Sequence, residues 1–369
     1  MFSRMNVEAP SNETLLLEIP KWDGAAPPPS APALRATQIV ALVPAHNEEE
    51  HIGATVESLL RQTRPLDRIV VVADNCTDRT VSIAGSYEGV EVIETLGNTS
   101  RKAGALNQGL DRVGRGYGYL LQMDADTELD ERFVEEALGE LQADPELGGV
   151  CSRFFAKDTT GFLRLLQAME YVRYDYIRHF RQGKVSVLSG TGVVFRVSAL
   201  PAGKPWNERS LVEDFALTLS LKRRGWNVKA GDRAVVYTDT MPTLHSFWRQ
   251  RLRWLRGTFE ELHREGWQTY TRRDILMQFL SVGAIGLRLL WVAAIGTTIL
   301  LSGDFSFAPI WLLATVVIAA ERMKSVWKLG WRARLTAVAL FPEEMYQLLR
   351  EAYVTRAAYL ALRRKSWQW

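Results

Sequence analysis

Two aspartates separated by one residue, Asp124 and Asp126, are the first candidates for chemistry in this chain of 369 residues. They follow an apolar run over residues 117–123, which is typical of a buried strand. Ligands of open α/β sheets bind at the carboxyl ends of the strands. Two carboxylates there would suit Mg²⁺ or Mn²⁺ bridging a diphosphate, because these hard cations prefer oxygen ligands. The alternative is a solvated acidic turn, which the pair alone does not exclude.

A second acidic pair, Glu213 and Asp214, opens a segment that we expect to be helical as far as Arg224. An aspartate that reaches an acceptor hydroxyl, directly or through one water, can act as a general base. The alternative is that both are ordinary acids of a first helical turn. The two interpretations are compatible, because a helix that begins at a cleft presents its first side chains to that cleft.

Gln250, Arg253 and Trp254 form a third group, since residues at i, i+3 and i+4 share one face of a helix. That face offers an amide, a cation for an anionic ligand and an aromatic surface. The alternative is a basic amphipathic helix at a membrane interface, with Trp248 and Trp254 as anchors.

The elements that would position these groups alternate between strands and helices. We expect strands over residues 38–43, 68–73, 90–94 and 117–123. We expect three helices: one over about 49–63, one from residue 80 onward, and one that the segment 98–107 opens and that ends at about residue 113. This order predicts a doubly wound, mostly parallel α/β sheet covered by helices on both faces. Neither a dinucleotide-binding glycine fingerprint nor a phosphate-binding P-loop motif occurs, which argues against both of those classes.

Acidic residues follow three of the predicted strands. They are Glu48 after the first, Asp74 and Asp78 after the second, and Asp124 and Asp126 after the fourth. Each has an ordinary explanation: Glu48 as a first-turn residue favoured by the helix dipole, and Asp74 as an N-cap or turn residue. Their shared position at strand ends favours a binding site instead.

Seven segments in order resemble the inverting glycosyltransferases of family 2, which have the GT-A fold. The segments are PAHNEE from Pro44, DNCTDRT from Asp74, N-x-x-x-K-x-x-A-L-N from Asn98, DAD from Asp124, SGTG from Ser189, VED from Val212 and QRLRW from Gln250. Val212 stands where the family has threonine. The Q-x-x-R-W segment is similar to the branch that contains cellulose, hyaluronan, chitin and poly-N-acetylglucosamine synthases. The resemblance covers about residues 38–260.

The resemblance implies transfer of a sugar from a nucleotide-sugar, a UDP-sugar in the first instance, to an acceptor hydroxyl, with help from Mn²⁺ or Mg²⁺. The donor nucleotide would be bound by Pro44, Ala45, Asn47, Glu48, Asp74, Lys102 and Asp124, with Asp126 on the metal and Asp214 as catalytic base. Glu213, Gln250, Arg253 and Trp254 would hold the diphosphate and the acceptor. For Lys102, a plain helix-surface position is the alternative. His245 could ligate the metal by resemblance, although a lone histidine is more often structural.

The later part of the chain carries membrane signals. Residues 275–301 are apolar and long enough to span a bilayer, whereas 305–320 is shorter. Basic residues flank both runs, which predicts a helical hairpin with both ends in the cytosol; a re-entrant or surface-lying pair is the alternative. Arg288 lies unexplained inside the first run. No apolar run of signal-peptide length occurs in residues 1–36, so we expect the catalytic part in the cytosol.

We therefore expect five regions: a flexible tail over residues 1–36, a GT-A domain over 37–240, an interfacial helix over 241–274, a membrane hairpin over 275–322 and amphipathic helices over 323–369. One hairpin is too small to enclose a polysaccharide pore. The expected reaction is thus transfer to a lipid, glycan or protein acceptor, and polymer synthesis would need a homo-oligomer or a partner. A catalytically silent scaffold that binds sugar nucleotides is the alternative from another class. The net charge of +3 suggests no nucleic-acid partner.

Overall fold

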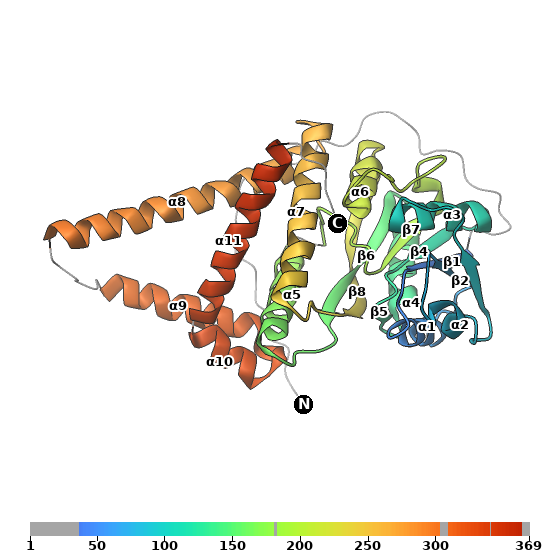
Figure 1. The fold of residues 1–369 in the computed structure, drawn as a ribbon, viewed down its shortest axis with the longest axis horizontal. Coiled ribbons are helices and arrows are strands. Elements are labelled where there is room, and N and C mark those ends of the chain that lie inside the picture. Colours follow the sequence, from blue (N-terminus) through green and yellow to red (C-terminus); the bar gives the residue numbers. More distant parts are fainter. Residues whose placement is uncertain (1–36, 181–182, 303–308, 340, 364–369) are drawn as a thin grey trace.

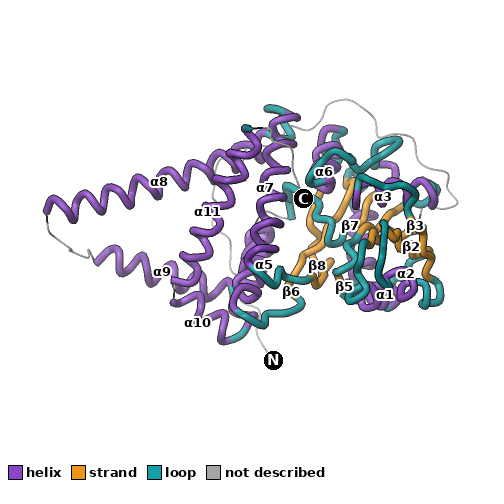
Figure 2. Tube along the Cα trace, viewed as in Figure 1, coloured by secondary structure: helices purple, strands orange, loops and turns teal. Residues whose placement is uncertain are grey.

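The computed structural model describes residues 37–180, 183–302, 309–339 and 341–363. The predicted tail over residues 1–36 and most of the predicted hairpin turn lie outside these residues. The described chain has two parts, an α/β domain and a helical part that extends from it (Figures 1 and 2).

The α/β domain is built on one sheet of eight strands in the order β3-β2-β1-β4-β7-β6-β8-β5. Strands β1 (Ile39–Ala45), β2 (Arg68–Ala73), β3 (Val90–Glu94) and β4 (Tyr119–Gln122) are parallel. β7 (Val193–Arg196) runs antiparallel between β4 and β6 (Leu147–Ala156). β8 (Asn227–Thr238) is parallel to β6 and antiparallel to β5 (Thr127–Leu129). Parallel pairs are in the majority, so the predicted α/β class is confirmed.

Successive residues of the central strands point to opposite faces of the sheet. In β1, Ile39, Ala41 and Val43 belong to one buried core, and Val40 and Leu42 belong to the other. Helices α1 (Ile52–Leu60), α2 (Thr80–Ala84), α3 (Arg101–Val113) and α4 (Phe133–Ala143) cover these faces. Burial on both faces explains why β1, β2 and β4 read as nearly continuous apolar runs.

The segment from residue 150 to 210 could not be placed from the sequence. It contains most of β6, helix α5 (Phe162–Phe180), β7 and the short helix η2 (Val197–Ala199). β6 and β7 extend the sheet beyond β4, while α5 crosses to the helical part (Figure 1).

The helical part begins with α6 (Glu213–Arg223), which lies against the sheet, and α7 (Leu244–Glu265). The side chain of Thr243 accepts a hydrogen bond from the backbone N–H of Ser246 and so caps α7. α11 (Phe341–Leu362) packs along α7. α8 (Arg272–Ser302) and α9 (Pro309–Ser325) project away from the rest, and η3 (Trp327–Leu329) and α10 (Trp331–Ala339) lead back to α11 (Figure 1).

α8 is the one helix of the described residues that is long and apolar enough to cross a membrane. Its stretch Arg272–Thr298 contains an apolar window with a mean hydropathy of 1.9, and no residue of that window is buried inside the protein. α9, at 17 residues, falls short of that criterion. A spanning hairpin therefore remains a prediction.

The structure explains Arg288, the charge inside the apolar run. Its guanidinium reaches α11, where it lies 3.0 Å from Glu344 and 3.4 Å from Glu351. Arg322 of α9 also pairs with Glu344, at 3.1 Å. These pairs fasten the middle of α8 and the last turns of α9 to α11.

Candidate active site

The two aspartates after β4 lie at the carboxyl edge of the sheet, beside the end of β1, because Leu42 of β1 pairs with Gln122 of β4. Burial, followed by repulsion from Asp124 and Asp239, raises the pKa of Asp126 to about 6. Burial, followed by repulsion from Asp126 and Asp124, raises the pKa of Glu48 to about 7. Glu48 thus shares one electrostatic cluster with both aspartates of the D-x-D.

Asp239 is a member of this cluster that the sequence did not reveal. It directly follows β8, and its carboxylate lies 3.2 Å from Nδ1 of His51. It also contributes to the raised pKa of both Glu48 and Asp126. The available signal was its position after a strand, the same signal that marked Glu48 and Asp74.

The cluster suits a divalent cation, since repulsion among partly buried carboxylates is relieved by a bound positive charge. No group of three or more His, Cys, Asp or Glu residues in the described chain is already arranged around a metal position, and this includes His245. Mg²⁺ commonly takes only one or two protein carboxylates and obtains its other ligands from substrate phosphates and water. The residues present therefore fit a metal that arrives with a phosphorylated ligand.

Lys102 of α3 connects the first acidic pair to the second. Its ammonium forms an ion pair with Asp124 and lies 3.3 Å from Oε1 of Glu213. Burial alone would lower the pKa of Lys102, but the carboxylates of Asp124 and Glu213 raise it above its usual range. One residue of each acidic pair therefore contacts the same lysine, although the two pairs are far apart in the sequence.

Asp214 lies in the first turn of α6. Its Oδ2 accepts a hydrogen bond of 3.3 Å from the backbone N–H of Gly190, and its Oδ1 accepts one of 2.7 Å from Phe215. Burial, followed by repulsion from Glu213, raises the pKa of Asp214 to about 6. A buried carboxylate with such a pKa is ionised at neutral pH and still basic enough to take a proton.

Gly190 brings its backbone close to both acidic pairs. A Cβ at this position would lie 2.6 Å from Nζ of Lys102 and 3.7 Å from the carboxylate of Asp124. Any larger residue would displace the lysine. The sequence singled out the segment from Ser189 to Gly192 but did not place it in the site.

The predicted nucleotide-binding residues gather at the ends of β1 and β2. Pro44 and Ala45 are the last two residues of β1. Asn47 has a φ of 54°, and its side-chain oxygen accepts a hydrogen bond of 2.8 Å from the backbone of Thr77. Asp74 follows β2 directly, so these side chains lie at one edge of the sheet.

Asp74 is buried, and its Oδ1 accepts hydrogen bonds from Thr95, Asn98 and Asn75 at 2.8 to 3.0 Å. The residue at the N-cap of α2 is Arg79, so the interpretation of Asp74 as an N-cap is wrong. A carboxylate held by three donors is rigid, which suits a contact with a base or a ribose.

The Q-x-x-R-W residues lie on α7. Arg253 donates a hydrogen bond of 3.4 Å to the carbonyl of Leu211, which precedes α6, and Trp254 is partly exposed. Oε1 of Gln250 is buried and has no hydrogen-bond partner among the described residues. Burial, followed by repulsion from Arg253, lowers the pKa of Arg101. Two guanidinium groups that repel each other beside Lys102 favour an anionic ligand.

Arg251, between these residues, anchors α7 to its neighbours. It is buried, pairs with Glu170 of α5 at 2.6 Å, and lies 4.6 Å from the ring centre of Trp254. The hydroxyl of Tyr346 in α11 donates to the same carboxylate at 2.8 Å. The Q-x-x-R-W helix is thus fixed by α5 and α11.

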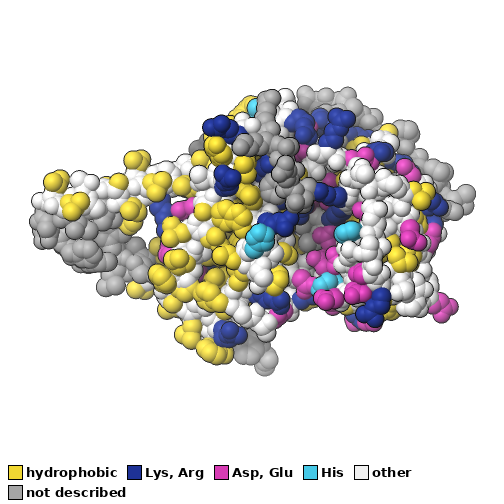
Figure 3. All heavy atoms as spheres, viewed as in Figure 1, with side chains coloured by type: hydrophobic (Ala, Val, Ile, Leu, Met, Phe, Trp, Pro, Cys, Tyr) yellow, Lys and Arg dark blue, Asp and Glu magenta, His cyan; other side chains and the backbone are white. Residues whose placement is uncertain are grey.

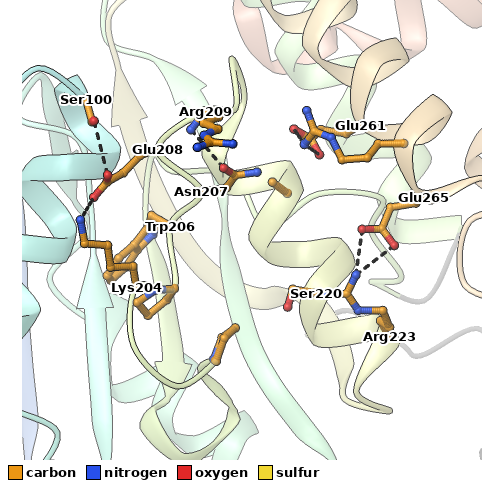
Figure 4. A pocket seen from close by; sticks show the side chains of 14 residues that line it. Ser100, Lys204, Trp206, Asn207, Glu208, Arg209, Ser220, Arg223, Glu261 and Glu265 are labelled. Atoms are coloured by element: carbon orange, nitrogen blue, oxygen red, sulfur yellow. Dashed lines mark hydrogen bonds and ion pairs between the residues drawn. The ribbon is translucent and has the colours of Figure 1, made fainter.

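A hollow of about 600 Å³ lies beside this site, between residues 201–209 and helices α6 and α7. Figure 4 shows Ser100, Lys204 and Glu208 on one side and Arg223, Glu261 and Glu265 on the other. Nε1 of Trp206 donates to the side chain of Gln122 at 2.8 Å, which fixes the loop to the strand that carries the D-x-D. The hollow neighbours the carboxylate cluster but does not include it.

The geometry is that of an α/β domain whose sheet edge carries clustered carboxylates and a paired lysine, next to a buried aspartate at the start of a helix. Figure 3 shows acidic and basic side chains gathered around a hollow between the two parts. Residues 40–202 match the model of the family described as glycosyl transferase family 2. The family resemblance predicted from the motifs is therefore confirmed over residues 40–202.

Two curated relatives are poly-beta-1,6-N-acetyl-D-glucosamine synthases. The one from Staphylococcus epidermidis is 26% identical over 245 residues, which cover 65% of this chain and 59% of the relative. The one from Staphylococcus aureus (strain COL) is 27% identical over 263 residues, which cover 69% and 62%. The match thus spans about three fifths of the length of these relatives.

A solved structure extends the likeness to the helical part. It is the mannosyltransferase PcManGT from Pyrobaculum calidifontis in complex with GDP-Man and Mn²⁺, with a TM-score of 0.59 and 18% sequence identity. The alignment covers 94% of this chain and 91% of that chain. This likeness shows a shared fold, which is of the GT-A type.

Proposed function

We propose that this protein is a membrane-associated inverting glycosyltransferase, which moves a sugar from a nucleotide-sugar to an acceptor hydroxyl. The carrying observation is the position of Lys102, whose ammonium is paired with Asp124 and lies 3.3 Å from Glu213. It supports a site in which the diphosphate of a donor and the base for an acceptor are neighbours.

In the proposed donor site, Pro44, Ala45, Asn47 and Asp74 hold the nucleoside at the ends of β1 and β2. The proposed donor is a UDP-sugar. N-acetylglucosamine is the first sugar to test, because the relatives are named for its polymer. Lys102 and Arg253 supply positive charge to the diphosphate, the lysine as a point charge and the arginine as a planar fork.

Asp126 would hold the divalent cation, Mn²⁺ or Mg²⁺, with Asp124 toward the nucleotide and Glu48 close by. The bound cation would supply Lewis-acid stabilisation of the charge on the leaving diphosphate. The raised pKa values of Glu48 and Asp126 support this assignment, because both carboxylates gain from a positive neighbour.

On the acceptor side, Asp214 takes the proton from the attacking hydroxyl, while the N–H of Gly190 holds its Oδ2. The hydroxyl displaces the nucleoside diphosphate from the opposite face of the sugar, which inverts the anomeric centre. Glu213 and Gln250 orient the acceptor, and the partly exposed ring of Trp254 offers a surface on which a sugar can stack.

The membrane position rests on α8, whose exposed apolar stretch is long enough to span a bilayer. We place the catalytic domain on the cytoplasmic side, with a lipid, glycan or protein as acceptor. A homo-oligomer or a partner becomes necessary if the product is a polymer, which the names of the relatives make the second candidate.

The test is a panel of nucleotide sugars with Mn²⁺, in which released nucleoside diphosphate is measured for the full chain in detergent. We expect one sugar nucleotide to be turned over, and Asp214→Asn to lose about 10²–10⁴-fold of that activity. Asp111→Asn, an exposed aspartate of α3, is the matched control. Unchanged turnover in Asp214→Asn would remove the base assignment, and product mass separates single transfer from a polymer ladder.

A further inference from the structure

The exposed face of α10 and α11 is apolar over both helices. It carries Trp331 and Leu335 of α10 and Phe341, Met345, Leu348 and Tyr359 of α11, each at least two fifths exposed. Phe341, Met345 and Leu348 follow each other at spacings of four and three residues, so they form one stripe along α11. We refer to these six residues as the α10–α11 face, and Figure 3 shows apolar side chains gathered over this part of the molecule.

The acidic and the basic residues of this region differ in whether they form ion pairs within the protein. Residues 323–363 contain seven basic and three acidic residues. All three acids are paired with arginines of other helices: Glu343 with Arg173 of α5, and Glu344 and Glu351 with Arg288 of α8. The carboxylates are therefore already neutralised within the protein.

The basic residues are left without such partners. None of Lys324, Lys328, Arg332, Arg350, Arg356 and Arg363 forms an ion pair with a described carboxylate, and all six are exposed. The guanidinium of Arg334 lies 3.9 Å from the ring centre of Trp327. Glu321, in the preceding turn of α9, is an exposed carboxylate just outside this stretch. The α10–α11 face thus combines apolar side chains with unbalanced positive charge.

An apolar helical stripe with arginines and tryptophans beside it has the physical properties of a helix that lies in a membrane interface. The face continues directly into α8, because Arg288 ties α11 to the apolar stretch Arg272–Thr298. We infer that the α10–α11 face docks on a bilayer surface of anionic phospholipids beside α8. The inference rests on the proposed membrane location and adds the class of lipid.

The charge pattern also argues against a second copy of this chain on the same face. A two-fold interface would bring the identical unpaired arginines together, and like charges would oppose the contact. An anionic bilayer instead offers apolar volume and negative charge in one surface, and each basic residue near it strengthens binding about fivefold.

Docking would also restrict the motion of α7. Tyr346 of α11 donates to Glu170, which pairs with Arg251 between Gln250 and Arg253. A bilayer that orders α11 therefore also orders the helix that carries the proposed diphosphate and acceptor contacts.

The test uses the full chain in lipid nanodiscs of phosphatidylcholine alone or mixed with phosphatidylglycerol, both containing brominated acyl chains. The bromine quenches the fluorescence of tryptophans at the bilayer. Subtraction of the fluorescence of the Trp331→Phe variant isolates the signal of Trp331. We expect this signal to be quenched in the anionic discs and to lose its quenching in neutral discs and at high salt. Arg356→Glu combined with Arg363→Glu, two arginines that lie over the ring of Tyr359, should abolish the difference between the lipids. Arg112→Glu combined with Arg233→Glu on the α/β domain should leave it intact.

Equal quenching in neutral and anionic discs would overturn the inference, because the lipid charge would then play no part. Loss of quenching in both lipids, with two copies per disc, would overturn it in favour of a self-association interface. Release of nucleoside diphosphate from the donor, measured on the same discs, reports separately on the proposed enzyme function. Quenching that follows the lipid charge in discs without turnover would support the docking and contradict the function.

Discussion

Lys102 lies between two carboxylates to which we assign different tasks: it is paired with Asp124 and lies 3.3 Å from Glu213. The pKa of Asp214 depends on two of these groups, because Glu213 raises it and Lys102 lowers it. The proposed donor site and the proposed base are therefore electrostatically linked. Removal of either charge should shift the pKa of Asp214 in a known direction.

The first prediction concerns the pH dependence of transfer. With the pKa of Asp214 at about 6, activity should rise with pH through about 6 as the base loses its proton. Lys102→Gln should move this limb to higher pH and Glu213→Gln to lower pH, each by on the order of one pH unit. The measurement is kcat/KM against pH with the best donor of the panel. A limb that stays in place in both variants would show that Asp214 is not the titrating group.

The second prediction concerns stability without metal. The pKa of Glu48 is raised from 4.5 to about 7 and that of Asp126 from 3.8 to about 6. A carboxylate whose pKa is raised by folding stabilises the protein while it is protonated, and that contribution is lost as pH rises through the folded pKa. In chelator, thermal stability should fall between about pH 4 and 7 on account of these two groups.

Added Mn²⁺ should restore that stability at neutral pH, because it binds the ionised carboxylates of the folded state. Asp126→Asn should stabilise the metal-free protein at neutral pH by on the order of 1–3 kcal/mol. Thermal unfolding in detergent measures both effects, and Asp111→Asn is the control that should leave the pH slope unchanged. A metal-free protein that gains stability over this pH range would contradict the prediction.

The sequence was sufficient for the first four parallel strands. In β1, β2 and β4 both faces are buried, which makes residues such as Val40 and Val43 apolar without interruption. β8 was missed because its run, NVKAGDRAVVYT, mixes exposed and buried positions. Its place in the sheet depends on β6, which lies far away in the sequence.

The site residues show the same contrast between local signals and contacts across the sequence. Asp124, Lys102 and Asp214 lie in segments with recognisable motifs, so residue type and spacing marked them. Asp239 and Arg101 belong to the site through proximity alone: Asp239 acts on Asp126 across the sheet edge, and Arg101 on Arg253. A single sequence carries no signal for the contact of Arg101 with Arg253, and the signal for Asp239, its position after β8, was lost because β8 itself was missed.

The third prediction concerns the close approach of Gly190. In Gly190→Ala, a Cβ 2.6 Å from Nζ of Lys102 forces the lysine away from Asp124. The end of a lysine side chain moves easily, so the fold should be retained while turnover falls about 10–100-fold through misplacement of the charge. Steady-state kinetics together with thermal unfolding separate the two effects.

Gly139→Ala is the matched control, because nothing lies within 4 Å of a Cβ at this position in α4. That variant should keep full activity and gain about 0.5–1 kcal/mol of stability from the helix propensity of alanine. If Gly190→Ala also keeps full activity, the contact between Gly190 and Lys102 has no part in transfer.

The fourth prediction concerns the pair that joins α8 to α11. Arg288 pairs with Glu344 at 3.0 Å and with Glu351 at 3.4 Å. Arg288→Gln should lower the free energy of unfolding in detergent by roughly 1–2 kcal/mol, because it leaves the mostly buried carboxylate of Glu351 without its cation. Arg61→Gln, which removes an exposed pair with Glu57, should change stability by less than about 0.5 kcal/mol.

A double-mutant cycle of Arg288→Gln with Glu351→Gln tests the contact itself. Two residues that interact directly should give a coupling energy of about 0.5 kcal/mol or more, whereas independent residues give additive changes. A measurable coupling would mean that an arginine inside an apolar run is retained for its place on α11, which links the projecting helix to the helix packed along α7. Additive changes would mean that apolar packing alone sets the position of α8, and that the charge of Arg288 does not hold α8 to α11.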